Sequence, residues 1–265
     1  MSSQEILRDV RADKVDQVVA DFIAIGAAAE KFPQANGLFM VVATFAGSVQ
    51  LSPKATASPE ESLAALAPAP PVALPPVDPS TNFADLAAEY LLYFDACRIT
   101  PAHAVEVSAR LSRLLDHAPR YQALGTSLGI PWFFIGIVHS LESSANFSTH
   151  LHNGDPLTAR TVRVPAGRPQ AGQPPFTWEA SARDALAMRG LLGLNDWSTA
   201  RSLYRFEGYN GFGYRARRMT SPYLWSFSQL YSKGRFVADH QFDPESVSKQ
   251  CGAAVLLKAL QQSGH

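Results

Sequence analysis

The stretch "IPWFFIGIVHSLE", residues 130–142, is the part of the sequence that says most about the fold. Pro131 suits the first turn of a helix and helps one to start there. Four large apolar residues then follow on one helical face: Phe133, Phe134, Ile137 and Leu141. The pattern predicts a buried helix that starts near Pro131 and ends near Glu142, with a carboxylate on its last turn.

Further helical patterns flank this segment. Residues 81–97 begin with a capping Thr or Asn and carry an apolar stripe, and residues 101–129 suit one or two more helices. Helical composition returns at 177–191, with Thr177 as N-cap, at 198–210, and at 244–262 behind Pro244. Residues 147–178 are rich in Pro, Gly and Thr, which favours loops and allows a short hairpin. We expect a mostly α domain with a loop-rich insertion.

The N-terminal part differs from the rest in composition. Apolar residues at helical spacing predict an amphipathic helix over 4–30, whereas 37–52 fits either a strand or a buried helix. Eight of the 19 prolines fall in residues 52–80, as expected of an extended linker. The predicted organisation is a helical accessory segment at 1–51, a Pro/Ala-rich linker at 52–80, and a mostly α domain at 81–265.

Composition narrows the possible functions. The 265 residues are 46% hydrophobic, carry no net charge and have a pI near 7.1, which gives no electrostatic case for binding nucleic acid. No apolar stretch is long enough to span a bilayer, and the charged N-terminus does not resemble a signal peptide. Two cysteines are too few for a disulfide scaffold, so buried free thiols are expected, with a single Cys97–Cys251 bridge as the alternative.

Glu142 is the candidate with the clearest chemistry. The negative end of the helix dipole and the apolar surroundings both raise the pKa of a carboxyl group at this position. A carboxylic acid that stays protonated near neutral pH can donate a proton to the leaving oxygen of a glycosidic bond. A glutamate near a helix end is ordinarily solvated, but here an apolar helix precedes it and a polar loop follows it.

Two motifs resemble one family of enzymes. "GIVHSLESSANF", residues 136–147, resembles the catalytic helix end of lysozyme-like muramidases and soluble lytic transglycosylases, in which serine follows the acidic glutamate. "FEGYNGFGYR", residues 206–215, resembles the "AYNAG" segment that lines the sugar cleft in the same superfamily. The resemblance to bacterial and phage lysozyme family proteins covers roughly residues 120–260 and implies that the domain at 81–265 is a lysozyme-like catalytic domain.

The resemblance implies roles for individual residues. It makes Glu142 the general acid, Ser143 the serine that supports it, and Tyr209 and Asn210 sugar-binding residues of the cleft. The segment 211–213 departs from the family's pattern, because glycine replaces alanine and a phenylalanine is inserted, so its turn stays undetermined. The implied substrate is the β-1,4 bond between N-acetylmuramic acid and N-acetylglucosamine in peptidoglycan.

A second carboxylate is expected in most glycosidases. Asp155 is the first candidate and Glu207 the second. Asn-Gly-Asp-Pro is also a strong turn sequence, so Asp155 has a structural alternative. Without a second carboxylate, the N-acetyl group of the substrate could act as nucleophile, and a 1,6-anhydro sugar could be the product.

Further residues are candidates for sugar contacts. They lie in the polar loop and among the late aromatic residues: His152, Asn153, Tyr214, Tyr223 and Trp225. Arg215, Arg217 and Arg218 could form either a solvated face or a basic rim that holds the anionic wall. His150 and His152 could instead bind zinc together with Asp155, as in a peptidase or amidase, but further ligands are missing.

We therefore predict a peptidoglycan hydrolase that needs no metal or cofactor. Its partner is the glycan strand of peptidoglycan, and residues 1–51 could contact a delivery or assembly partner. No nucleic-acid partner and no membrane span are expected. The protein would be made in the cytoplasm and act at the cell wall or periplasm after delivery. The alternatives are a lytic transglycosylase, a non-catalytic wall-binding module and the zinc peptidase or amidase.

Overall fold

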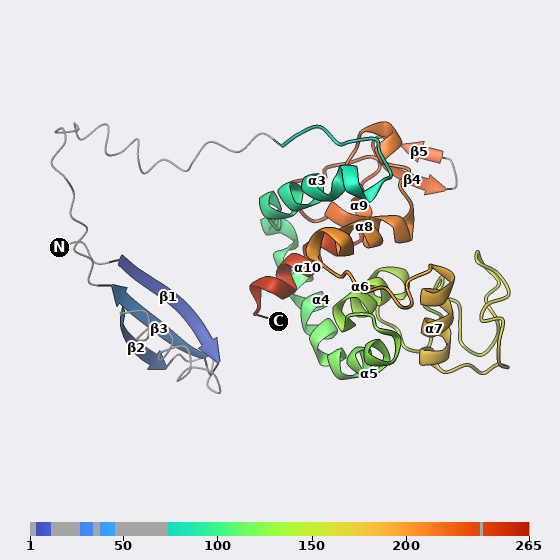
Figure 1. The fold of residues 1–265 in the computed structure, drawn as a ribbon, viewed down its shortest axis with the longest axis horizontal. Coiled ribbons are helices and arrows are strands. Elements are labelled where there is room, and N and C mark those ends of the chain that lie inside the picture. The colour runs from blue at the N-terminus through green and yellow to red at the C-terminus, as the bar shows by residue number, and fades with distance from the viewer. Residues whose placement is uncertain (1–3, 12–26, 34–37, 46–73, 239–240, 265) are drawn as a thin grey trace. The chain divides into compact units, whose positions relative to one another are not determined.

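The computed structural model describes residues 4–11, 27–33, 38–45, 74–238 and 241–264 (Figure 1). The chain divides into two compact units, Met1–Pro70 and Pro71–His265. The first unit contains strands and the second contains mainly helices, so the prediction of a mostly α protein is confirmed for the larger unit.

The N-terminal unit contains an antiparallel three-stranded sheet with the order β1-β3-β2. Its strands are β1 (Gln4–Arg11), β2 (Ala27–Pro33) and β3 (Leu38–Phe45). The register pairs Gln4 with Phe45 in β1 and β3, and Ala27 with the same Phe45 in β2 and β3.

The predicted helix over 4–30 is therefore wrong at both of its ends, and its middle, residues 12–26, lies outside the described residues. The strand alternative for 37–52 is confirmed at 38–45. The β-branched and aromatic content of β3 suits the central strand of the sheet, and the pairing of β1 with β3 outweighs the helical spacing of the β1 residues.

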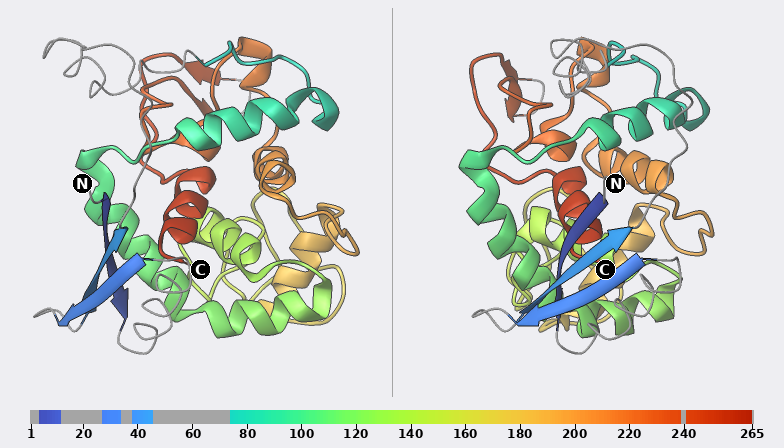
Figure 2. Two further views of the ribbon diagram at one scale, coloured as in Figure 1. Left: turned by 60° about the vertical axis from the view of Figure 1, so that its left-hand side comes forward. Right: turned by 90° about the vertical axis from the view of Figure 1, so that its left-hand side faces the viewer.

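The C-terminal unit is built from helices joined by loops and one hairpin. The α-helices are α3 (Phe83–Ala96), α4 (Ala104–Asp116), α5 (Ala118–Leu128), α6 (Trp132–Ser143), α7 (Trp178–Met188), α8 (Thr199–Asn210), α9 (Pro222–Trp225) and α10 (Ala253–Gln262). Short 3-10 turns η1 (Pro101–His103) and η2 (Arg215–Arg217) and the strands β4 (Arg235–Ala238) and β5 (Gln241–Asp243) complete it. Helix α10, red in Figure 2, packs against α4, α6, α8 and α9 and forms the centre of the unit.

Several helix starts follow the sequence signals. The side chain of Asn82 accepts a hydrogen bond from the Ala84 amide at the start of α3, and that of Thr177 accepts one from Ala180 at the start of α7. Pro131 is the N-cap of α6, one residue before the helix. These predicted boundaries are confirmed.

The predicted start of the last helix at Pro244 is wrong, because α10 begins at Ala253. Its N-cap, Gly252, donates from its backbone amide to the Ser226 carbonyl at 3.0 Å, and a Cβ there would overlap the backbone of Leu224. This close approach holds residues before 253 in an irregular path along α9.

Helix α6 is buried on every side rather than on one face. Phe134, Ile135, Ile137 and Val138 are fully buried, and a Cβ on Gly136 would overlap the side chains of Leu114 and Tyr121. A helix that is apolar all round belongs in the interior. Its position in the core keeps its last turn, and hence Glu142, in a defined place.

The end of the predicted linker belongs to the C-terminal unit. Val77 is buried, the Asp78 amide donates to a Glu89 carboxylate oxygen at 2.7 Å, and the Tyr93 hydroxyl donates to the Pro75 carbonyl at 2.7 Å. Residues 74–80 therefore pack on α3, ahead of the boundary that the sequence places at 81.

The remaining organisation agrees in part with the sequence. Residues 144–177 form the loop-rich insertion, and a hairpin of β4 and β5, which was not predicted, lies at 235–243. Cys97 and Cys251 are free and buried, as predicted. In the described part of the chain no single helix has the length and hydropathy of a membrane span, and only α5 and α6 together, bent by 116°, meet that test.

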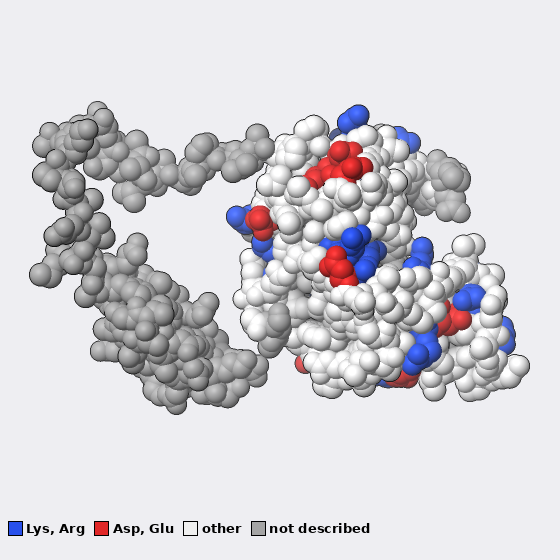
Figure 3. All heavy atoms as spheres, in the orientation of Figure 1, with Lys and Arg blue, Asp and Glu red and all other residues white. Residues whose placement is uncertain are grey.

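Charged side chains are sparse on one face of the C-terminal unit. On the face drawn in Figure 3, acidic and basic side chains lie interspersed and most of the described surface carries no charge. This distribution agrees with a net charge of zero for the chain.

Candidate active site

The backbone turns sharply just after Glu142. Ser144 and Ala145 both adopt left-handed conformations, with φ of 54° and 55°, and the Ala145 amide donates to the His139 carbonyl at 3.0 Å. Non-glycine residues adopt this conformation at a cost of about 1–2 kcal/mol each. Two in succession end the helix abruptly and leave Glu142 on its last turn. Such strained backbone is frequent at functional sites.

The Glu142 side chain is half-buried, and its carboxyl group has one hydrogen-bond partner among the residues that the structure describes. The Tyr223 hydroxyl donates a hydrogen bond to Oε1 of Glu142 at 2.8 Å. Burial raises the pKa of Glu142, while the Tyr223 hydrogen bond and the positive charge of Arg189 act against that rise without cancelling it. The protonated acid that the sequence predicts thus agrees with the geometry of the site.

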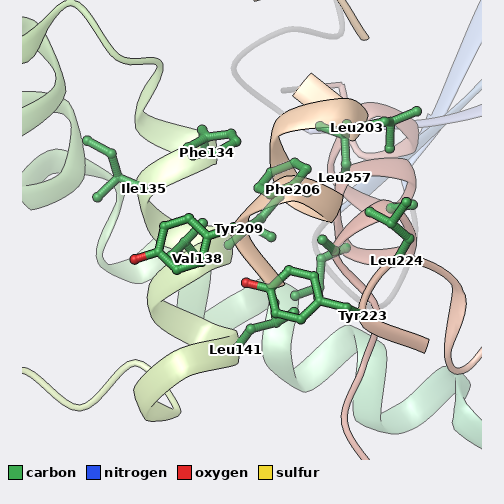
Figure 4. Close-up of a cluster of buried hydrophobic side chains, with 14 of the residues drawn as sticks. Phe134, Ile135, Val138, Leu141, Leu203, Phe206, Tyr209, Tyr223, Leu224 and Leu257 are labelled. Atoms are coloured by element: carbon green, nitrogen blue, oxygen red, sulfur yellow. The ribbon is translucent and has the colours of Figure 1, made fainter. Parts of the chain in front are cut away.

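Two more side chains complete this environment. Tyr209 on α8 is buried, and after burial the Glu142 charge is the largest factor that raises the pKa of its hydroxyl. The guanidinium carbon of Arg189, the residue after α7, lies 4.6 Å from the centre of the Tyr209 ring. Figure 4 shows the hydroxyls of Tyr209 and Tyr223 pointing the same way, from α8 and α9 toward α6.

These four residues come from distant parts of the chain. Sequence analysis named three of them, Glu142, Tyr209 and Tyr223, but it missed Arg189. Arg189 lies in no motif, and its proximity to the site follows only from the way α7 packs. The site is an acid with two buried phenols and one guanidinium, which suits proton donation to an oxygen atom.

Asp155 has the structural role that the sequence left as an alternative. Its Oδ2 accepts hydrogen bonds from the amides of Val162 at 2.8 Å and Arg163 at 3.0 Å, and its Oδ1 accepts one from the Arg163 guanidinium at 2.6 Å. Although burial opposes ionisation, these bonds lower the pKa of Asp155 to about 2. The carboxylate organises the loop, which corrects the expectation of a catalytic partner.

The Glu207 carboxylate is also engaged in hydrogen bonds and ion pairs with other side chains. Its Oε2 accepts a hydrogen bond from the Tyr90 hydroxyl and lies 2.8–2.9 Å from two guanidinium nitrogens of Arg215. Arg215 in turn lies 2.9 Å from a Glu89 oxygen. Arg215 is 3% exposed, so it is part of a buried ion-pair network and not of a basic rim. Arg217 and Arg218 are exposed.

The two loop histidines do not form a metal site. His150 contacts the Ser181 hydroxyl through Nδ1 and the Ala159 carbonyl through Nε2, both at 2.8 Å. His152 contacts Asp184 through Nε2 at 2.8 Å and is buried, so it supports the loop instead of facing a sugar. Within the described residues no group of three or more His, Cys, Asp or Glu side chains could hold a metal ion.

Three more residues were predicted to belong to the site, Asn210, Ser143 and Asn153. Asn210 is exposed at the end of α8, and Ser143 donates its hydroxyl to the His139 carbonyl at 3.3 Å rather than to Glu142. Asn153 accepts from the Asp155 amide and donates to the Arg163 carbonyl, so its side chain shapes the loop.

Tyr214 and Trp225 are core residues, contrary to the groove expected from sequence. Tyr214 is 5% exposed and its hydroxyl accepts a hydrogen bond from the Phe236 amide at 3.0 Å. Trp225 is 3% exposed and packs against Tyr93. The aromatic pattern alone could not separate these residues from Tyr223, because all three lie among similar neighbours in the sequence.

Comparison with known proteins adds no relative. No protein-family model, no curated protein and no solved structure matches this chain, so its likeness to lysozyme family proteins stays a prediction that rests on two motifs.

Proposed function

We propose that the C-terminal unit is a glycosidase that cleaves the β-1,4 bond between N-acetylmuramic acid and N-acetylglucosamine in peptidoglycan. The observation that carries this proposal is the Glu142 carboxyl group, half-buried at the end of α6, with a raised pKa and a tyrosine hydroxyl at 2.8 Å.

Glu142 acts as the general acid. The proton leaves its carboxyl group as the bond between the anomeric carbon and the bridging oxygen breaks, and the sugar that carries that oxygen departs as an alcohol. In hydrolysis, water then adds to the anomeric carbon and returns a proton to the Glu142 carboxylate. The Tyr223 hydroxyl, which donates to Oε1, leaves the other carboxyl oxygen to carry the proton. The same hydrogen bond stabilises the carboxylate that remains after the transfer.

A lytic transglycosylase is the second candidate, and the two other carboxylates favour it. Asp155 is held by Val162 and Arg163, and Glu207 by Tyr90 and Arg215. Neither is free to activate a water or attack the sugar. A nucleophile supplied by the substrate, first its N-acetyl group and then its own 6-hydroxyl, would give a 1,6-anhydro product.

We also propose where in the cell the enzyme acts. The enzyme would work at the cell wall or periplasm after delivery, and the N-terminal unit is the part that would contact a delivery or assembly partner. Its three-stranded sheet takes the place of the helix expected there.

Mass analysis of fragments released from purified peptidoglycan tests the proposal. A reducing-end muramic acid indicates hydrolysis, a 1,6-anhydromuramic acid indicates transglycosylation, and cut peptides contradict both. Glu142→Gln should release no fragments, whereas Glu245→Gln, at an exposed position just after β5, should behave as the parent does. Wall binding without any fragment release by the parent would identify a binding module instead.

A further inference from the structure

A pocket lies beside the Glu142 site and shares two residues with it, Tyr209 and Arg189. It holds about 170 Å³, and Tyr209 and Arg189 form the side nearest to Glu142. The rest of the lining comes mainly from α8 and the residues after it, namely Tyr204, Arg205, Gly208 and Phe212. We refer to it as the arginine pocket.

The walls of the arginine pocket are aromatic. The rings of Tyr204 and Phe212 are 5.1 Å apart, and a Cβ on Gly208 would come within 3.2 Å of the Phe212 ring. Glycine at 208 thus allows Phe212 to lie against α8. This ring is the residue inserted into the "YNG" segment, so the departure from the family's motif builds one wall of the pocket.

The polar groups of the pocket are two guanidinium groups. Neither Arg189 nor Arg205 forms a salt bridge with any carboxylate in the described part of the chain. The guanidinium carbon of Arg205 lies 4.0 Å from the centre of the Trp197 ring, and its Nη1 donates to the Asp196 carbonyl. The Asp196 side chain is instead paired with Arg201 at 3.2 Å.

Two guanidinium groups that lie on aromatic rings, and that form no salt bridge within the described residues, are suited to bind an anion. Guanidinium groups bind planar carboxylates through paired hydrogen bonds, and aromatic walls exclude competing water. Pockets for drug-sized ligands measure about 300–1,000 Å³, so the smaller volume here fits a group about the size of one amino acid.

We propose that the arginine pocket binds a carboxylate of the peptide attached to the muramic acid that occupies the Glu142 site. This inference rests on the proposed function, because the shared Tyr209 is what joins the pocket to the reacting sugar. It makes the protein selective for glycan strands that still carry stem peptides with free carboxylates. Arg189 and Arg205 are the residues that determine this selectivity.

The test is a binding measurement with a matched pair of ligands. The full chain carrying Glu142→Gln, which prevents turnover, is titrated calorimetrically with an N-acetylmuramyl dipeptide that has a free carboxylate and with its methyl ester. We expect the acid to bind about tenfold or more tightly than the ester, because a lost charge-assisted hydrogen bond commonly costs this much.

Variants then locate the effect. Adding Arg205→Gln should bring the ratio of the two affinities close to one, and Arg205→Lys should keep part of the preference for the acid. Arg183→Gln is the control, since Arg183 is an exposed arginine of α7 that donates to the Ser127 hydroxyl and does not line the pocket. It should leave the ratio unchanged. Melting temperatures of the variants show that each is folded.

Equal affinities for acid and ester in the parent would overturn the inference, as would a preference that survives Arg205→Gln in a folded chain. The proposed function is judged separately, by fragment release from peptidoglycan. If the chain releases fragments but binds both ligands equally, the proposed glycosidase function is supported and the inference about the pocket is rejected. If the chain releases no fragments, both are rejected.

Discussion

Glu142 and Glu207 are two glutamates of the same unit, each hydrogen-bonded to a tyrosine, but we propose different roles for them. Tyr223 donates to Glu142 and Tyr90 donates to Glu207. The difference is the cation. Arg215 lies 2.8 Å from Glu207, whereas no salt bridge to Glu142 exists among the described residues.

The comparison shows what a neighbouring guanidinium does to a buried acid. Although burial opposes its charge, the Glu207 carboxylate raises the pKa of Arg215, which is the signature of an ion pair. Burial raises the pKa of Glu207 itself as well, but Arg215 and the Tyr90 hydrogen bond oppose that rise and hold the carboxylate in the ion-pair network. Glu142 feels Arg189 only at longer range, so burial dominates and favours the protonated acid. We therefore propose that Glu207 supports the fold and that Glu142 supplies the proton.

The largest expected effect is the loss of activity when Glu142 is replaced. Glu142→Gln should lower kcat by about 10²–10⁴-fold, the usual contribution of a general acid. Its melting temperature should change little, because the amide still accepts from Tyr223. Turnover on purified peptidoglycan and calorimetric melting measure both quantities. A variant that keeps more than half of the parent's kcat would assign the proton to another group.

The next effect concerns the Glu207 network. Arg215→Met should cost about 3–5 kcal/mol of unfolding free energy, because it leaves a buried carboxylate without its cation. Urea unfolding measures this loss. Arg218→Met is the control, since Arg218 is exposed and surface changes are usually within about 0.5 kcal/mol. Equal stabilities of the two variants would show that the network is not buried in solution.

His139, one turn before Glu142 on α6, allows the effect of burial on a pKa to be measured apart from the effect of ion pairing. Burial lowers its pKa to about 4, from an ordinary value near 6.5. Between these two pH values the unfolded chain binds a proton that the folded chain does not. The stabilisation is therefore complete above pH 6.5 and is lost as pH falls toward 4.

We expect the unfolding free energy of the parent to fall by about 2–3 kcal/mol from this group between pH 7 and 4.5. His139→Leu should remove that part of the slope, whatever its cost at pH 7. Urea titrations of both chains at the two pH values check this. An equally steep loss in the variant would place the titrating group elsewhere.

The smallest expected effect concerns Tyr223 and Tyr90, the two tyrosines that donate hydrogen bonds to the glutamates. Tyr223→Phe removes a hydrogen bond that lowers the pKa of Glu142, so that pKa should rise further and the alkaline limb of the kcat profile should move to higher pH. The rate at the optimum should fall by less than about tenfold. Tyr90→Phe should leave the alkaline limb in place and cost about 1–2 kcal/mol of stability. A shift of the limb in both variants would argue against a local effect.

The sequence allowed the central helix and its acid to be predicted, because these depend on local patterns. Pro131 marks the start of α6 and the apolar run fixes its burial, so the position of Glu142 followed. The N-cap roles of Asn82 and Thr177 are equally local. The N-terminal sheet was missed because pairing between β1, β2 and β3 involves residues up to 41 positions apart, as for Gln4 and Phe45.

The candidate site was predictable only where a motif carried it. Tyr209 and Tyr223 could be named, but Arg189 reaches the site through tertiary packing alone. Asp155 and Glu207 resembled catalytic carboxylates until their partners, Arg163 and Arg215, were visible. The identity of a residue sets what it can do, and its neighbours decide what it does.

Carbon-13 NMR titration of the carboxyl groups, with Glu142→Gln to identify the Glu142 signal, tests the central claim most directly. We predict that this signal titrates at a pH clearly above the ordinary glutamate value near 4.3. Titration at or below that value would mean that the group is ionised at neutral pH and holds no proton for a sugar oxygen.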